Sequence, residues 1–105
     1  MYSKFGQFID GKWQPSSNNE TYDVINPATE EIIGQASKAT PADVDKALKS
    51  AEKGFEVWKK TSPWERSLLI RRIADLIRKK NKVLAKWLTL EVGKPFSEGL
   101  GEVNS

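Results

Sequence analysis

The stretch that decides the fold is SPWERSLLIRRIADLIRKK, residues 62–80. It opens with a capping box, in which Ser62 can accept from the backbone N–H of Glu65 while the Glu65 side chain accepts from that of Ser62. Pro63 stands at the first helical position, where a missing N–H costs nothing. Apolar residues then recur at helical spacing, at Leu69, Ile73, Leu76 and Ile77. The stretch therefore predicts an amphipathic helix.

A second helical pattern follows directly. We expect Asn81 to cap a helix whose apolar stripe is Leu84, Trp87, Leu88 and the aliphatic part of Glu91. Gly93 fits the left-handed residue that ends a helix, and Pro95 stops it. A further helix is expected from about Ser97 to Val103. Because the chain ends inside that helix, whereas domains usually end in polar linkers, we expect a truncated domain.

A third helical pattern precedes residues 62–80. Thr40 is the expected cap, with Pro41 at the first position and Asp43 placed to return the capping bond. One apolar stripe follows, made of Val44, Leu48, Ala51, Phe55 and Trp58. Gly54 inside this helix costs about 1 kcal/mol relative to alanine, so we expect close packing at that position.

Residues 1–39 carry the strand signals. Asp10-Gly11, flanked by residues 8–9 and 12–13, suits a type I′ hairpin turn because both positions require positive φ. The polar segment 15–20 predicts an exposed loop. Two more β-prone runs, 22–25 and 32–36, are separated by an Asn-Pro turn at 26–30. We therefore expect an α+β segment of an α/β enzyme, with short antiparallel strand pairs in 1–39 and three to four amphipathic helices in 40–105.

Composition excludes several kinds of chemistry. The 105 residues include 17 basic and 14 acidic ones, no cysteine and no histidine. Without those two residue types, the usual zinc sites, cysteine nucleophiles and Ser–His centres are impossible within this chain. The sequence has no apolar run long enough for a membrane span, and its first ten residues lack the features of a secretory signal. We expect a cytoplasmic protein with no membrane partner.

A basic cluster leaves one alternative open. It consists of Arg71, Arg72, Arg78, Lys79, Lys80, Lys82 and Lys86. Such a cluster could bind nucleic acid, but cations are also favoured near helix C-termini and on solvated helix faces. We favour the solvated face, because no RNA-stacking or groove-reading motif accompanies the charge.

Several motifs carry a family resemblance in order and over nearly the whole chain. Residues 8–13 (FIDGKW) resemble the opening hairpin of the aldehyde dehydrogenase superfamily, and residues 24–34 (VINPATEEIIG) resemble its Asn-Pro-Ala-Thr-Gly-Glu connection, with Glu30 where the family usually has glycine. The helical region matches at 55–58 (FEVW), 65–66, 76–77 and 88–95 (LTLEVGKP). The last of these leans toward the succinate-semialdehyde dehydrogenase branch.

The resemblance implies an oxidoreductase that converts an aldehyde to a carboxylic acid with NAD or NADP. In that family a cysteine attacks the aldehyde and a glutamate activates water, and these residues lie beyond the matching region. This chain would be an N-terminal part of the cofactor-binding domain, inactive and unable to bind NAD or NADP by itself. Its partner would be the remainder of a parent enzyme, itself a homo-oligomer. A stand-alone helical interaction module derived from the family is the other alternative.

One site is implied within this segment. Some family members hold a monovalent cation with main-chain carbonyls at positions matching Val24, Ile25 and Glu91, although these residues also suit strand core and helix surface. No catalytic or nucleotide-binding residue is expected here. Gly99-Leu100-Gly101 lacks a preceding strand and the third glycine of a dinucleotide loop. We assign core packing and helix-start anchoring to the four tryptophans Trp13, Trp58, Trp64 and Trp87, and support of a helix C-terminus to Lys94.

Overall fold

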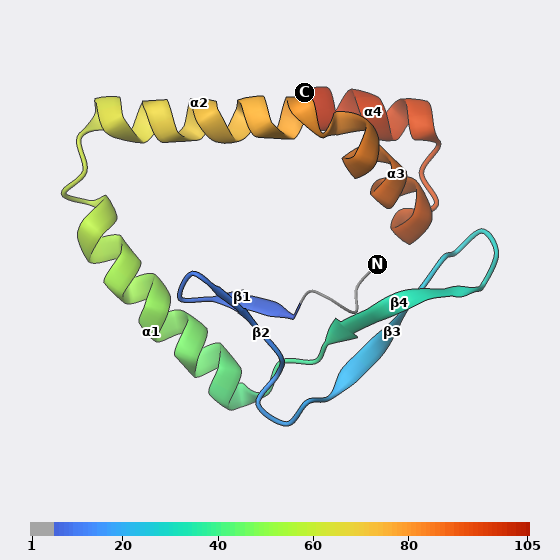
Figure 1. Ribbon diagram of the computed structural model, residues 1–105, viewed down its shortest axis with the longest axis horizontal. Helices are drawn as coiled ribbons and strands as arrows, with labels where there is room; N and C mark the ends of the chain where they lie inside the picture. The colour runs from blue at the N-terminus through green and yellow to red at the C-terminus, as the bar shows by residue number, and fades with distance from the viewer. Residues whose placement is uncertain (1–5) are drawn as a thin grey trace. The chain divides into compact units, whose positions relative to one another are not determined.

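The computed structural model describes residues 6–105, and Figure 1 labels its elements. Two strand pairs come first and four helices follow, as expected. The elements are β1 (Gln7–Ile9), β2 (Lys12–Gln14), β3 (Thr21–Ile25), β4 (Ile32–Ser37), α1 (Pro41–Trp58), α2 (Pro63–Lys79), α3 (Asn81–Val92) and α4 (Phe96–Asn104). β1 pairs with β2, and β3 pairs with β4. Of the ten N-terminal residues in which no secretory signal is found, Met1 to Phe5 lie outside the described residues.

The chain forms two compact units. The first unit comprises Met1–Val24 and Ile32–Lys60, and the second comprises Ile25–Glu31 and Thr61–Ser105. The boundary in the helical region falls in the short link between α1 and α2.

The β1–β2 hairpin of the first unit has the geometry that its sequence predicts. Phe8 pairs with Trp13 across the antiparallel ladder. Asp10 and Gly11 both have positive φ, at 55° and 75°, as a type I′ turn requires. The rings of Phe8 and Trp13 lie 5.1 Å apart in a tilted arrangement, which adds an aromatic contact to the ladder. A local turn signal therefore fixes this hairpin.

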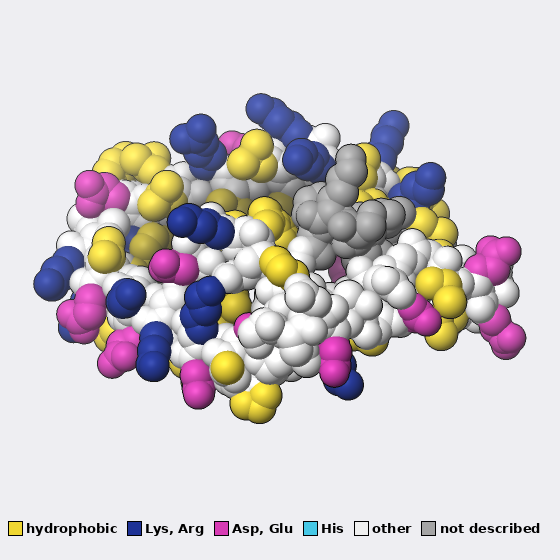
Figure 2. Space-filling view, turned by 60° about the horizontal axis from the view of Figure 1, so that its bottom comes forward, with side chains coloured by type: hydrophobic (Ala, Val, Ile, Leu, Met, Phe, Trp, Pro, Cys, Tyr) yellow, Lys and Arg dark blue, Asp and Glu magenta, His cyan; other side chains and the backbone are white. Residues whose placement is uncertain are grey.

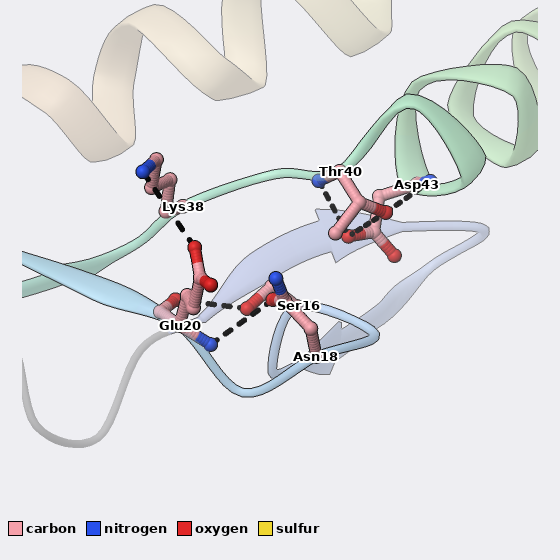
Figure 3. A network of polar contacts seen from close by, with 6 residues as sticks. All are labelled: Ser16, Asn18, Glu20, Lys38, Thr40 and Asp43. Atoms are coloured by element: carbon pink, nitrogen blue, oxygen red, sulfur yellow. Dashed lines mark hydrogen bonds and ion pairs between the residues drawn. The ribbon is translucent and has the colours of Figure 1, made fainter.

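A polar network at the start of α1 ties the helix to the preceding loop, and Figure 3 shows its contacts between Thr40 and Asp43. The expected capping box is present: Asp43 N donates to Thr40 Oγ1 over 3.2 Å, and Thr40 N donates to Asp43 Oδ2 over 2.9 Å. The same carboxylate oxygen accepts from the backbone N–H of Ser17 at 3.1 Å. Asp43 is only 6% exposed. The backbone donors of Thr40 and then Ser17 hold its pKa well below the ordinary value.

The loop before β3 is held by its own polar contacts. Ser16 Oγ donates to the carbonyl of Glu20 at 2.8 Å, and Glu20 N donates to Asn18 Oδ1 at 3.1 Å. The backbone N–H of Lys38 donates to the same Glu20 carbonyl at 2.9 Å, and the two side chains form an ion pair at 3.6 Å. Residues 15–20 therefore form a structured loop, while most of their side chains remain exposed as expected.

The helix starts of the second unit differ in kind. α2 has the expected capping box, with Glu65 N donating to Ser62 Oγ at 3.2 Å and Ser62 N donating to Glu65 Oε2 at 3.1 Å. The prediction that Asn81 caps α3 is wrong by one residue. Lys80 is the cap and has no side-chain capping bond, because α3 follows α2 almost directly. α4 begins at Phe96.

The tightest packing in the second unit lies between α3 and α4. Ala85 is fully buried, and Gly99 is buried against it. A Cβ placed on Gly99 would lie 3.3 Å from the Ala85 carbonyl oxygen. Two small residues therefore allow the two helix backbones to approach closely.

Both units leave most of their apolar side chains uncovered. In the described part of the chain, Ile9 and Ala85 are the buried hydrophobic residues. The α1 stripe is exposed at Val44, Leu48 and Phe55, and no residue of α2 is buried. Figure 2 shows hydrophobic side chains at the surface on the face that it draws. Among the described residues no helix is long and apolar enough to cross a membrane.

The close packing expected at Gly54 is not supplied by the residues that the structure describes. A Cβ at that position would meet nothing within 4 Å. The apolar stripe of α1 and this small residue therefore both face space that the described residues leave open.

Candidate functional site

The C-terminal end of α3 and the β3–β4 turn form one structural site in the second unit. Gly93 ends α3 in the left-handed conformation, with φ of 74°, as expected from the sequence. A Cβ at Gly93 would lie 3.1 Å from the Cγ of Pro27. Glycine is thus required at this position for two reasons: the backbone has a positive φ, and the proline ring approaches too closely for a side chain.

The turn that carries Pro27 is organised by Asn26. Its buried side chain accepts from the N–H of Ala28 at 2.9 Å, and its backbone carbonyl accepts from the N–H of Glu30 at 2.8 Å. Glu30 has a φ of 61°. This left-handed conformation is unfavourable for a residue with a Cβ. It accounts for the glycine that the family usually has at this position, whereas nothing in the structure explains the glutamate.

Lys94 has a more specific partner than the helix end that was expected for it. Its ammonium forms an ion pair with the carboxylate of Glu102 on α4. The hydrogen bond and the charge of Glu102 raise the pKa of Lys94 above its ordinary value, with a smaller contribution from Glu98. The contact connects the end of α3 with the last turn of α4. No signal in the sequence identified the pair, because it depends on how the two helices cross.

An apolar groove lies beside this site within the second unit. Its volume is about 390 Å³, and its lining consists of Ile77, Leu84, Trp87, Leu88, Glu91 and Val103. The groove collects the apolar stripe predicted for α3 together with one residue each from α2 and α4. Glu91 is the one charged residue of the lining, so the groove suits an apolar ligand or side chain better than a polar one.

The residues of the expected cation site are assigned to different units. Val24 belongs to the first unit, whereas Ile25 and Glu91 belong to the second. Ile25 is 51% exposed and does not contribute to a core in this chain. Within the described residues no cluster of acidic side chains could hold a metal ion. That finding does not bear on a site made of main-chain carbonyls, and the cation site stays a prediction.

Gly99 and Gly101 lie inside a helix. The N–H of Gly99 donates to the carbonyl of Pro95 at 3.0 Å, so it is used within the first turn of α4. A dinucleotide loop instead leaves such N–H groups free to bind phosphate. Both glycines therefore belong to helical backbone and not to a phosphate-binding loop, and Gly99 also allows α4 to pack closely on α3.

The basic cluster lies on α2 and α3 and at their junction. Arg78 is paired with Asp75 at 3.1 Å, an exposed helical pair of small energetic value. The tryptophans expected in a core or at a helix start vary widely in exposure, from Trp64 at 73% and Trp13 at 58% to a half-buried Trp87. In the described part of the chain, Trp64, in the first turn of α2, and Trp13, beside Phe8, are thus surface residues.

Comparisons with known proteins identify the fold. A sequence model of the aldehyde dehydrogenase family matches residues 13–105. The chain belongs to the aldehyde dehydrogenase family.

Solved structures of the family have the same backbone arrangement. A point mutant of betaine aldehyde dehydrogenase from Staphylococcus aureus, in complex with NAD+, is 34% identical, with a TM-score of 0.92 over 99% of this chain and 21% of that one. A 3,6-anhydro-L-galactose dehydrogenase in complex with NADP is 31% identical, with a TM-score of 0.91 over 95% of this chain and 21% of that one. The chain therefore spans about one-fifth of the length of these relatives.

Proposed function

We propose that this chain is the N-terminal scaffold segment of an NAD(P)-dependent aldehyde dehydrogenase and is inactive by itself. The observation that carries the proposal is that a chain matching one-fifth of NAD+-bound relatives contains no cysteine and no histidine. The nucleophile that the family uses must therefore come from another part of the enzyme. What this chain contributes is a set of helices and turns that supports the cofactor domain.

We infer that this segment does not bind a nicotinamide cofactor by itself. No glycine-rich loop follows a strand in the described residues, and Gly99 and Gly101 are engaged in α4. The cofactor, whether NAD or NADP, belongs to the parent enzyme. No step of the reaction is assigned to the residues of this segment.

Activity of the chain alone and of the parent enzyme tests the proposal. The purified 105-residue chain should show no aldehyde-dependent reduction of NAD or NADP. The same segment at the start of its full-length enzyme should support that reduction. Turnover by the isolated chain would contradict the proposal, and so would a full-length protein that oxidises no aldehyde.

Succinate semialdehyde is the substrate that we propose for the parent enzyme. The support is the LTLEVGKP sequence at residues 88–95, which resembles that branch of the family. The test compares kcat/KM of the full-length enzyme for succinate semialdehyde and betaine aldehyde. A preference for betaine aldehyde would overturn this substrate assignment and leave the family membership intact.

We also propose that the parent enzyme binds a monovalent cation through the main-chain carbonyls of Val24, Ile25 and Glu91. Carbonyl oxygens suit such hard cations, and any residue type can supply them. The melting temperature of the full-length enzyme should be higher in potassium or sodium chloride than in choline chloride at equal ionic strength. Equal melting temperatures would contradict the site.

Cytoplasmic location and a homo-oligomeric parent complete the proposed function. Fractionation of the native cells and sedimentation of the full-length enzyme test these two points. A monomeric parent enzyme would contradict the second.

A further inference from the structure

The groove in the second unit is part of a larger uncovered apolar surface. The groove itself is lined by apolar side chains of α2, α3 and α4 with Glu91 at its edge. Along α2, the side chains of Leu69, Ile73 and Leu76 are 49%, 56% and 50% exposed. They continue the helix face that Ile77 brings into the groove. We call the groove and this face of α2 together the docking surface.

The exposed area is larger than a compact chain of this mass requires. The chain exposes 8242 Å². A compact protein of 11.8 kDa would expose about 5,900 Å², and two separate compact units of half that mass about 7,100 Å² together. The surplus is about 1,100 Å² even on the second basis, and a stable interface needs about 800 Å² from each partner. The chain as a whole therefore leaves more surface open than its mass requires, and the docking surface is part of that open area.

The charge of α2 argues against a second copy of this chain as the occupant. Between Pro63 and Lys79 the helix has five basic residues and two acidic ones. Two copies docked through α2 would bring two basic helices together, which like-charge repulsion disfavours. The same backbone occurs at a TM-score of 0.92 in a relative whose chain is about five times longer. In that relative about four-fifths of the chain lies outside the matched segment, so the occupant we argue for is the part of an aldehyde dehydrogenase that this chain does not match.

Local signals start the two long helices without help from that partner. α1 and α2 each begin with a complete capping box and proline at the first position. α3 ends at Gly93, which is itself in the left-handed conformation. Such caps act within a few residues of the chain, so they need no covalent link to the rest of an enzyme.

We propose that the docking surface binds the remaining four-fifths of an aldehyde dehydrogenase in trans, as a separate polypeptide. The inference rests on the proposed scaffold function and adds that a peptide bond between the two parts is dispensable. Helix capping preorganises the segment, and burial of the docking surface supplies the binding energy.

The test uses Staphylococcus aureus betaine aldehyde dehydrogenase from which the matched segment has been deleted. This acceptor is co-expressed with the affinity-tagged 105-residue chain, and in a parallel culture with the dehydrogenase's own segment as a tagged separate chain. We expect both segments to retain the acceptor in a one-to-one ratio after affinity purification and sedimentation. Failure of this chain to retain it overturns the proposal, whether or not the dehydrogenase's own segment succeeds.

A matched pair of variants locates the surface. Ile77→Asp places a carboxylate in the groove, whereas Leu68→Asp places one nine residues earlier, on the opposite side of the same helix. Ile77→Asp should weaken retention of the acceptor at least tenfold, and Leu68→Asp should change it less than threefold. Equal effects would overturn the assignment to the groove. Circular dichroism of both variants must show unchanged helix content.

The docking readout is independent of catalysis. The covalently joined form, with this chain replacing the matched segment of the dehydrogenase, is assayed for aldehyde oxidation. An active joined form with no docking of separate chains overturns docking in trans and leaves the scaffold function standing. An inactive joined form with docking contradicts the scaffold function alone. Assembly of this chain with itself in place of the acceptor would show a second copy as the occupant and overturn the proposal.

Discussion

Each of the two units is stabilised internally by a different kind of contact. In the first unit a buried carboxylate, Asp43, connects the start of α1 with the preceding loop through backbone hydrogen bonds. In the second unit two small residues, Ala85 and Gly99, allow α3 and α4 to pack closely. Among residues 6–105, neither unit buries a large apolar side chain completely. The difference teaches that local polar signals and close backbone packing can shape a segment that leaves most of its own apolar side chains exposed.

The largest expected effect comes from filling the α3–α4 contact. Gly99→Leu would force a side chain against the Ala85 carbonyl and should destabilise the second unit by about 1–3 kcal/mol. Gly101→Leu is the control, because a Cβ there meets nothing within 4 Å and leucine favours helix by about 1 kcal/mol over glycine. Urea unfolding followed by circular dichroism measures both. Equal destabilisation would contradict close packing at Gly99.

Acidification is the next effect, and it should act on both units through their capping carboxylates. Hydrogen bonds with Ser62 lower the pKa of Glu65, as Thr40 and Ser17 lower that of Asp43. A carboxylate whose pKa is lowered by folding stabilises the fold at any pH above its ordinary pKa, which is 4.5 for Glu65 and 3.8 for Asp43. This stability is lost as the pH falls through the pKa of the folded state.

Amide NMR between pH 5 and about pH 1 measures this acid dependence one unit at a time. Asp43→Asn should remove the titration seen at the Ser17 and Thr40 amides and leave that at Ser62 unchanged. Glu65→Gln should do the converse. A single titration shared by both units would show that they do not respond separately.

A smaller effect is expected from the threonine half of the first capping box. Thr40→Ala removes the oxygen that accepts from the N–H of Asp43 and should cost about 1 kcal/mol. Thr40→Ser keeps that oxygen and should cost only a few tenths of a kcal/mol. Thermal unfolding of both variants tests the difference. Identical losses would show that the hydroxyl is not used as a cap.

The smallest effect is expected at Glu30, the residue with positive φ in the turn between β3 and β4. Glu30→Gly should stabilise the chain by about 0.5–1 kcal/mol, because relief of a positive φ slightly exceeds the entropy cost of glycine. Glu31→Gly, whose position lacks that positive φ, should destabilise it by a similar amount. Urea midpoints of both variants provide the comparison. Destabilisation by Glu30→Gly would mean that the side chain contributes more than its backbone strain costs.

The parts of the fold that were predictable from sequence are those set by neighbouring residues. The Asp10-Gly11 turn, the capping boxes at Thr40 and Ser62, and the Gly93 end of α3 all depend on short segments. The prediction that Asn81 caps α3 was wrong because a good capping residue is not used where one helix follows the previous one almost directly.

Contacts between distant segments could not be read from the sequence. The bond from Ser17 to Asp43 joins residues 26 positions apart, and the fit of Pro27 against Gly93 depends on how a turn meets a helix end. For the candidate site, residue types excluded chemistry within the chain, whereas the groove needed three helices in place. The cation site at Val24, Ile25 and Glu91 rests on family resemblance, because any residue can offer a main-chain carbonyl.

Hydrogen exchange of the α2 backbone amides tests the central claim most directly. It should be measured in the isolated 105-residue chain and in the same segment joined to the rest of an aldehyde dehydrogenase. If the core of this segment is completed by the rest of the enzyme, the amides of Leu69, Ile73 and Ile77 should exchange rapidly in the isolated chain and become strongly protected in the joined form. Equal, strong protection in both would show that the segment is a self-sufficient domain and would contradict the account.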